Sequence, residues 1–147
     1  MIALIQRVNK ASVSIDNKLY SQIKRGYVIL LAIFDFDNEQ DVDILVDKVI
    51  NLRIMADENN KMNLSIKETN NKVLVVSQFT LCANTSKGRR PSFIHAKNPK
   101  DAEKLYSHFI KKIKEKGIKV KTGEFGTYMN VEIHNDGPVT ILIDSKK

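Results

Sequence analysis

The chain has 147 residues, 42% of them hydrophobic, and no Pro/Gly/Ser-rich or low-complexity stretch, so we expect a single domain over residues 1–147 with one core. With one cysteine, Cys82, the chain can form no internal disulfide. The apolar stretch at its start is too short for a signal peptide, and no apolar run reaches the roughly 20 residues that span a bilayer. We therefore expect a soluble cytoplasmic protein without a membrane partner. Lysine and arginine exceed aspartate and glutamate by seven (24 against 17), which favours a polyanionic partner such as a nucleic acid.

The first part of the chain predicts strands followed by a helix. Apolar and polar residues partly alternate from Ile2 to Ile15, as in strands with one buried face, and Asp16-Asn17 predicts a turn after them. The apolar run Tyr27–Phe34 is short and rich in β-branched residues, which is typical of a central strand. Asp37 or Asn38 can cap an amphipathic helix whose apolar residues recur at helical spacing: Val42, Leu45, Val46, Val49, Ile50 and Leu52.

A second buried strand and a second helix follow. Lys72–Val76 predicts a strand that runs into Ser77-Gln78-Phe79-Thr80-Leu81, which would place polar groups at a strand end. Asn98 is a typical helix cap, and Pro99 suits the first helical position because its missing N–H is not needed there. Gly117 predicts the end of this helix, whose apolar stripe consists of Ala102, Leu105, Tyr106, Phe109, Ile110 and Ile113.

The last part of the chain predicts three short strands: Ile118–Lys121, Met129–His134 and Val139–Ile143. We expect a turn at Asn135-Asp136-Gly137-Pro138 between the last two. The order of elements predicts an α+β domain with largely antiparallel, barrel-like sheets backed by two main helices.

The common catalytic motifs are absent. There is no G-x-S-x-G, H-E-x-x-H, phosphate-binding glycine loop, cysteine pair or metal-ligand cluster, and we expect no metal and no cofactor. Three histidines could act as bases, but His95 lies in a basic loop, His108 on the polar side of a predicted helix, and His134 in a strand beside the predicted turn. Cys82 has no charged neighbour to lower its pKa, so we expect a small buried residue.

Two segments carry a resemblance to a known family. Ser77-Gln78-Phe79-Thr80-Leu81-Cys82-Ala83 and Asn135-Asp136-Gly137-Pro138-Val139-Thr140 resemble the two motifs of the D-aminoacyl-tRNA deacylases, SQFTLxA and NxGPVT, at every defined position. The resemblance runs along nearly the whole chain, through Gln6-Arg7-Val8, Leu52-Arg53-Ile54, Lys61–Ser65, Lys87–Phe93 and Gly123–Gly126.

Departures from the family pattern lie outside both motifs. Asn17, Ser21 and Asn60 stand where the family often has glycine, and Thr127 replaces a common alanine. Asparagine adopts the left-handed backbone conformation more readily than other non-glycine residues, so we expect the turns at Asn17 and Asn60 to persist.

The resemblance implies an enzyme that hydrolyses the ester bond of D-aminoacyl-tRNA and so proofreads chirality in translation. It also implies a homodimer in which the Gly137-Pro138 peptide, with a cis bond, enters the partner's active site and its carbonyl oxygens select the configuration at Cα. Because glycine has two hydrogens at Cα, glycyl-tRNA mischarged on tRNA(Ala) is an expected further substrate.

For the reaction itself, the resemblance points to Ser77, Gln78, Phe79 and Thr80. We expect the backbone N–H groups of Phe79 and Thr80 to bind the developing oxyanion, and the 2′-OH of the terminal ribose to assist. Thr80 as a covalent nucleophile is the alternative, although no histidine or lysine is assigned to activate it.

The substrate would be held by residues outside the first motif. Phe125 and Met129 are assigned to the terminal adenine, with plain core packing as the alternative, and the substrate site also includes Val139 and Thr140. The tRNA is expected to bind the basic loop Lys87, Arg89 and Arg90, or the basic run Lys111–Lys121, which otherwise is a solvated helix end.

Two other functions remain open at this point. One is a basic nucleic-acid-binding module that shares the fold, which would have no need for Gly137-Pro138 beside Thr140. The other is a related deacylase that edits a different mischarged tRNA and has a trans Gly-Pro peptide.

Overall fold

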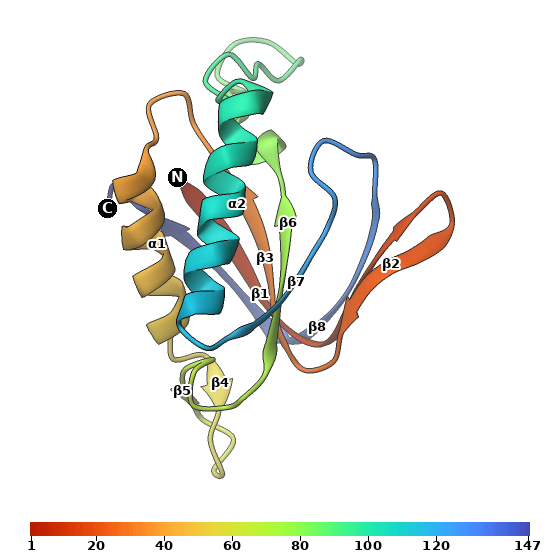
Figure 1. Cartoon of the computed structure of the whole chain (residues 1–147), viewed down its shortest axis with the longest axis vertical. Coiled ribbons are helices and arrows are strands. Elements are labelled where there is room, and N and C mark those ends of the chain that lie inside the picture. Colours follow the sequence, from red (N-terminus) through yellow and green to blue (C-terminus); the bar gives the residue numbers. More distant parts are fainter.

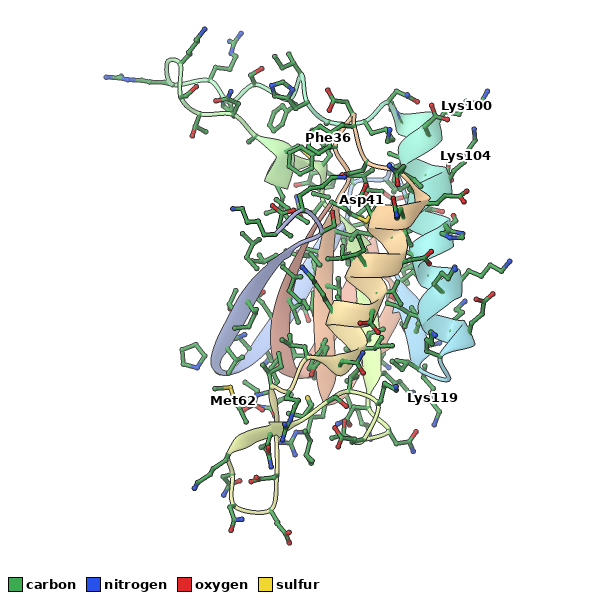
Figure 2. All side chains as sticks on the ribbon, turned by 90° about the vertical axis from the view of Figure 1, so that its left-hand side faces the viewer. Phe36, Asp41, Met62, Lys100, Lys104 and Lys119 are labelled. Carbon is green, nitrogen blue, oxygen red and sulfur yellow. The ribbon has the colours of Figure 1, made fainter.

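The computed structural model describes every residue from Met1 to Lys147. Two helices lie side by side on one face of a twisted sheet (Figures 1 and 2). The elements in chain order are β1 (Ile2–Ile15), β2 (Lys18–Ile23), β3 (Gly26–Ala32), α1 (Glu39–Asn51), β4 (Met55–Ala56), β5 (Met62–Leu64), β6 (Lys72–Ser77), the 3₁₀ turn η1 (Phe79–Cys82), α2 (Pro99–Glu115), β7 (Lys119–Thr122) and β8 (Asn130–Asp144). Neither α1 nor α2 is long and apolar enough to span a bilayer.

The sheet is mixed and has the strand order β2-β1-β3-β6-β7, with β8 along the remaining edge of β1. β1 pairs antiparallel with β2, β3 and β8, whereas β6 pairs parallel with β3 and β7. Parallel neighbours need a crossover connection, and crossovers of one hand place their helices on the same face of the sheet. The predicted α+β class with two backing helices is therefore confirmed, and the two crossovers account for the parallel pairs.

Both faces of the sheet carry a hydrophobic core. The larger core lies under the helices, where Val49 and Phe109 pack against Ile29 and Val75 with no exposed surface. A smaller core on the other face contains Val8, Ala11, Val13, Ile23, Val28, Leu74 and Val76. Ser21 donates a hydrogen bond to the Thr122 carbonyl oxygen (2.7 Å), which ties β2 to β7 and brings the sheet close to a barrel.

The predicted helix caps are confirmed, and so are the turns at Asn17 and Asn60, where φ is +60° and +58°. Asn38 caps α1 and forms a reciprocal capping box with Asp41, and Asn98 caps α2 by accepting from the Asp101 N–H. Gly117 follows α2 with a left-handed φ of +81°. In Figure 2, Lys100 and Lys104 project from α2 to solvent, on the side away from the sheet.

The predicted turn at residues 135–138 is wrong. β8 is one strand from Asn130 to Asp144 and pairs with β1 over its length, with Val8 opposite Asn135 and Gln6 opposite Thr140. Four residues of β8, 136–139, therefore bulge opposite the single residue Arg7. The Asn135 side chain bridges the bulge because it accepts from the Val139 N–H (3.1 Å) and donates to the Val139 carbonyl oxygen (3.0 Å). The strand thus continues in its original direction.

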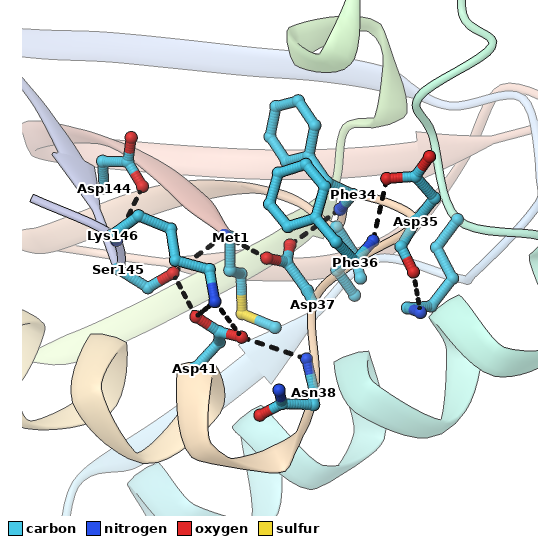
Figure 3. Close-up of polar contacts among 12 residues, drawn as sticks. Met1, Phe34, Asp35, Phe36, Asp37, Asn38, Asp41, Asp144, Ser145 and Lys146 are labelled. Atoms are coloured by element: carbon cyan, nitrogen blue, oxygen red, sulfur yellow. Dashed lines mark hydrogen bonds and ion pairs between the residues drawn. The ribbon is translucent and has the colours of Figure 1, made fainter.

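A polar network joins Met1 and the C-terminal residues Ser145 and Lys146 to the start of α1 (Figure 3). The Met1 ammonium group lies 2.7 Å from Asp37 and donates to the Ser145 hydroxyl (2.9 Å), which in turn donates to Asp41 (2.8 Å). Lys146 completes the network through its ion pair with Asp41 (2.8 Å). Burial by itself would raise the pKa of Asp41, but hydrogen bonds from Lys146, Ser145 and Asn38 hold that pKa below its usual value.

Asp41→Asn tests this network through pH. Because the folded-state pKa of Asp41 is lowered, its stabilising effect is present above the unfolded pKa of about 3.9 and is lost as the pH falls further. We expect Asp41→Asn to lower the free energy of unfolding at pH 7 by about 1–3 kcal/mol and to flatten its decline at acidic pH. Urea unfolding between pH 3 and pH 7 measures both. Asp43→Asn, which removes an exposed pair with Lys112, is the control and should cost less than about 1 kcal/mol; equal losses would contradict the prediction.

Gly26→Ala tests the close approach of β3 to β6. A Cβ at Gly26 would lie 1.9 Å from the Lys72 carbonyl oxygen, which belongs to backbone and cannot move aside locally. We expect a loss of at least about 3 kcal/mol in the free energy of unfolding, measured by denaturant titration. Gly88→Ala is the matched control, because Gly88 also has a positive φ but open space around its Cβ position. It should cost only about 1–2 kcal/mol, and a similar cost at Gly26 would contradict the steric argument.

Candidate active site

A cavity of about 790 Å³ opens where β6 ends. Ser77, Gln78, Phe79 and Thr80 line it, together with the segment Phe125–Met129 that precedes β8. The N-terminal end of α2 contributes Asn98, Pro99 and Ala102. Residues that are about 50 positions apart in the sequence therefore meet in one space.

The chain changes from a strand to a 3₁₀ turn where it lines this cavity. β6 ends at Ser77, and the Gln78 N–H donates to the Leu31 carbonyl oxygen (2.8 Å). The 3₁₀ turn then begins with the Leu81 N–H, which donates to the Gln78 carbonyl oxygen (3.2 Å). The N–H groups of Phe79 and Thr80 come before this bond and take no part in the hydrogen bonding of the turn. The Gln78 side-chain amide donates to the Thr80 hydroxyl, which links the two polar side chains.

Phe125 and Met129 line the cavity and also pack against the core. The Phe125 ring lies 5.6 Å from the ring of Tyr106, whose hydroxyl donates to the Val75 carbonyl oxygen (2.8 Å). Met129 lies close to Gly123, where a Cβ would stand 2.6 Å from the Met129 sulfur. Both predicted alternatives for Phe125 and Met129, core packing and exposure to a cavity, are therefore present together.

Further lining residues were not predicted from the sequence. Phe93 packs edge-on against Phe79, with ring centroids 5.1 Å apart, and Tyr128 is 95% exposed at the rim of the cavity. Lys97 also lines the cavity, but its ammonium group donates to the Asp35 carbonyl oxygen (2.6 Å). Tyr128 could have been noticed as an aromatic neighbour of Met129, whereas nothing in the sequence pattern marks Lys97.

No histidine lines the cavity. His95 is half-exposed and lies 3.6 Å from Asp35 instead. Cys82 is buried, as predicted, and burial raises its pKa to about 11, so that it remains a thiol at neutral pH. No group of three or more histidine, cysteine, aspartate or glutamate side chains is placed to hold a metal ion.

The second motif presents an exposed peptide. Gly137 and Pro138 project from the β8 bulge, and the bond between them is cis, the isomer implied by the resemblance. A Cβ at Gly137 would lie 2.4 Å from the Val139 nitrogen, so only glycine fits there. Arg7 anchors the bulge to β1, because its guanidinium group donates to the Asp136 carbonyl oxygen (3.1 Å) and pairs with the Asp136 carboxylate (3.2 Å).

This peptide lies far from the cavity of its own chain. The bulge begins beside Val8, which pairs with Gly26, which in turn pairs with Lys72 at the start of β6. The cavity lies at the other end of β6, five residues on at Ser77, or about 17 Å at 3.3 Å per residue. Of the two following residues, Val139 is buried in the core and Thr140 is exposed, and neither lines the cavity.

The basic loop lies beyond the end of β6, at the top of Figure 1. A two-residue bridge between Asn84 and Ser92 closes its base. Lys87, Arg89 and Arg90 are exposed on it and form no ion pair with a carboxylate. In the run Lys111–Lys121, by contrast, Lys112 pairs with Asp43 (2.8 Å), so part of the charge of this second basic segment is neutralised.

Comparison with known proteins identifies the family. The family model described as D-Tyr-tRNA(Tyr) deacylase matches residues 4–144. The chain is 50% identical to proteins named D-aminoacyl-tRNA deacylase from Thermosipho melanesiensis and Clostridioides difficile, and the alignments cover 100% of this chain and 99% of each relative.

Solved structures share the fold of this chain. One titled c-Myc DNA Unwinding Element Binding Protein is 38% identical over 98% of both chains and superposes with a TM-score of 0.92. A probable eukaryotic D-amino acid tRNA deacylase, 17% identical, shares the fold over 97% of this chain and 98% of its own with a TM-score of 0.86. The match over nearly the whole chain, with both motifs intact, shows that this protein belongs to the D-Tyr-tRNA(Tyr) deacylase family of ester hydrolases.

Proposed function

We propose that this protein hydrolyses the ester bond of D-aminoacyl-tRNA and releases free D-amino acid and tRNA. The observation that carries the proposal is the cavity at the end of β6, where the intact Ser77–Thr80 motif and the Phe125–Met129 segment line one space. Residues 1–147 act as one deacylase domain, and the proposed place of action is the cytoplasm, where charged tRNA is formed.

The proposed enzyme is a homodimer in which Gly137-Pro138 of one subunit completes the cavity of the other. One chain cannot supply both parts, because its own peptide and cavity lie at opposite ends of β6. An apolar row on the sheet face without helices supports a second copy: Leu4 pairs with both Leu30 and Leu142, and Leu142 is 59% exposed.

The proposed selectivity rests on backbone, because the enzyme must accept many D-side chains and spare L-aminoacyl-tRNA. A ten-thousandfold discrimination requires roughly 5.5 kcal/mol, whereas one methylene group in an apolar pocket contributes only about 1–3 kcal/mol. Carbonyl oxygens held rigidly can bind the substrate ammonium group and leave space for no more than a hydrogen on one side of Cα. The tight packing of Gly137 on Val139 and the support from Arg7 suit this role.

The ester carbonyl is proposed to bind at the start of the 3₁₀ turn. The N–H groups of Phe79 and Thr80 are not used by the turn and can donate to the oxyanion that develops during hydrolysis. Ser77 and Gln78 hold the strand end, with the Gln78 amide donating to the Thr80 hydroxyl. The 2′-OH of the terminal ribose assists the reaction, because no histidine lines the cavity to act as a base.

The remaining contacts concern the tRNA. Phe125 and Met129 offer an aromatic ring and a polarizable thioether to the terminal adenine. Thr140, which pairs with Gln6 of β1, and Val139, which the Asn135 side chain holds, position the inserted peptide. The exposed charges of Lys87, Arg89 and Arg90 bind acceptor-stem phosphates.

A nucleic-acid-binding role without catalysis is the second candidate. The net charge of +7 and the 38% identical relative titled as a DNA-unwinding-element binding protein favour it. The two candidates differ in whether the ester bond of a bound substrate is lost.

The direct test is to incubate the protein separately with D-tyrosyl-tRNA and L-tyrosyl-tRNA and to follow ester loss. We expect the D-ester to be cleaved at least about a thousandfold faster, which corresponds to roughly 4 kcal/mol in the transition state. Glycyl-tRNA(Ala) should also be cleaved. Binding without ester loss would overturn the proposed activity, whereas cleavage of D-alanyl-tRNA but not of glycyl-tRNA would overturn only the backbone sieve.

Thr80→Ala tests whether Thr80 is a covalent nucleophile. If the backbone N–H groups and the 2′-OH carry the reaction, kcat for D-tyrosyl-tRNA should stay within about tenfold of wild type, since the substitution keeps the main-chain N–H groups of residues 79 and 80 and the ribose is unchanged. A substrate whose terminal ribose lacks the 2′-OH should instead lose at least about a hundredfold in kcat. Thr80→Ser is the conservative control. Loss of turnover in Thr80→Ala with unchanged substrate affinity would favour the covalent mechanism.

A further inference from the structure

A second cavity, of about 610 Å³, lies at the opposite end of β6 from the active site. Four basic side chains line it: Lys10 from β1, Lys24 and Arg25 from the segment between β2 and β3, and Lys72 from the start of β6. They come from three separate parts of the sequence, so no basic run in the sequence predicts this cluster.

None of these four cations has a carboxylate partner. Elsewhere in the molecule Arg7, Lys112 and Lys146 each pair with an aspartate within 3.2 Å. Glu132 is the one acidic residue that lines the cavity, and it accepts a hydrogen bond from Ser12 (3.2 Å) rather than from a lysine. The cavity therefore has an excess of three positive charges, four cations against one carboxylate.

Neutral hydrogen-bond donors accompany the cations. The side-chain amides of Gln22, Asn70 and Asn71 line the same cavity, as does the hydroxyl of Ser14. Amide and hydroxyl donors beside lysine and arginine are the groups that contact phosphate oxygens of nucleic acids. A cavity of this volume with four cations from three segments suits several neighbouring phosphates of a chain better than one compact anion.

The strand register relates this cavity to the dimer proposed above. Lys72 pairs with Gly26, and Gly26 pairs with Val8, where the bulge carrying Gly137-Pro138 begins. The basic cavity and the exposed peptide thus lie at the same end of the sheet. When the peptide enters the active site of the other subunit, it brings the basic cavity of its own subunit toward that site.

We propose that the cavity formed by Lys10, Lys24, Arg25 and Lys72 binds backbone phosphates of the same tRNA whose 3′ end occupies the active site of the other subunit. This inference rests on the proposed deacylase function and dimer. Each tRNA then contacts both subunits: its 3′ end lies in the active site of one subunit, and its backbone phosphates bind the basic cavity of the other.

The test uses a variant that removes the four charges, K10Q/K24Q/R25Q/K72Q, in the full chain. Affinity for uncharged tRNA is measured by fluorescence anisotropy over a range of salt concentrations. Because each phosphate contact contributes about 0.7–0.9 to the salt slope, the slope of log affinity against log salt should fall by about three. The affinity at low salt should fall at least tenfold.

Two matched variants control for net charge and for folding. K61Q/K67Q/K100Q/K104Q removes four exposed lysines that line neither cavity and belong to neither basic segment considered for tRNA, and it gives the same net charge, 7 − 4 = +3; its salt slope should change by less than about one. The conservative variant K10R/K24R/R25K/K72R keeps every charge and should keep wild-type affinity. Equal losses in the two glutamine variants would overturn the proposal, because total charge rather than the cavity would then set the affinity.

Activity measurements separate this inference from the proposed function. With D-tyrosyl-adenosine, which has no phosphodiester, the cavity variant should cleave at the wild-type rate, whereas with D-tyrosyl-tRNA its KM should rise at least tenfold with little change in kcat. Equal losses on both substrates would overturn the RNA-phosphate site. Unchanged tRNA affinity together with weakened binding of inorganic pyrophosphate would assign the cavity to small phosphorylated ligands and also overturn it. If wild-type protein cleaves neither substrate, the proposed function fails, and the anisotropy result still decides whether the cavity binds RNA.

Discussion

The pairing of β8 with β1 has to accommodate four residues of one strand opposite a single residue of the other, and much of the structure depends on how this is done. Pro138 has no N–H to contribute to the ladder. The Asn135 side chain instead forms hydrogen bonds with the N–H and the carbonyl oxygen of Val139. Arg7 of β1 donates a hydrogen bond to the Asp136 carbonyl oxygen. β8 can therefore continue straight along β1 as far as Asp144. The residue after it, Ser145, joins the buried network at the start of α1.

The same bulge carries one of the two family motifs and keeps it far from the other. Gly137-Pro138 lies level with the start of β6 but two strands away from it, and Ser77–Thr80 lies where β6 ends. A rigid sheet cannot bend to bring these ends together, because its strands are packed on both faces. A site that needs both motifs therefore requires two chains. The exposed apolar row that contains Leu142 gives the proposed dimer a surface on which to form.

The cavity itself contains little titratable chemistry. No histidine lines it, Lys97 is engaged by the Asp35 carbonyl oxygen, and the nearby Cys82 thiol has a pKa raised by burial. The cavity does offer the main-chain N–H groups of Phe79 and Thr80 at a strand end, and the aromatic ring of Phe125 and the thioether of Met129 line it. Such groups suit the recognition of a shape, a configuration and a nucleobase. The proposed reaction accordingly relies on oriented N–H groups and on a hydroxyl supplied by the substrate.

Local patterns in the sequence were sufficient for much of the secondary structure. The helix caps Asn38 and Asn98, the stop at Gly117 and the central strand β3 all follow from interactions within a few residues, and each is confirmed. The same local reasoning failed at residues 135–138, because Asn-Asp-Gly-Pro has the composition of a turn. Whether such a segment reverses the chain or bulges depends on Arg7 and Val8 of a strand more than 120 residues away.

By itself, then, the sequence determined the helices, most strands, the family and the two motifs, since these depend on residue type, spacing and near neighbours. The tertiary structure decided how Phe125–Met129 comes to line the cavity of Ser77–Thr80 and how far from it Gly137-Pro138 lies. It also gathered Lys10, Lys24, Arg25 and Lys72 around one cavity. These placements depend on strand order and register, which are set by long-range pairing and packing and leave no periodic trace in the chain.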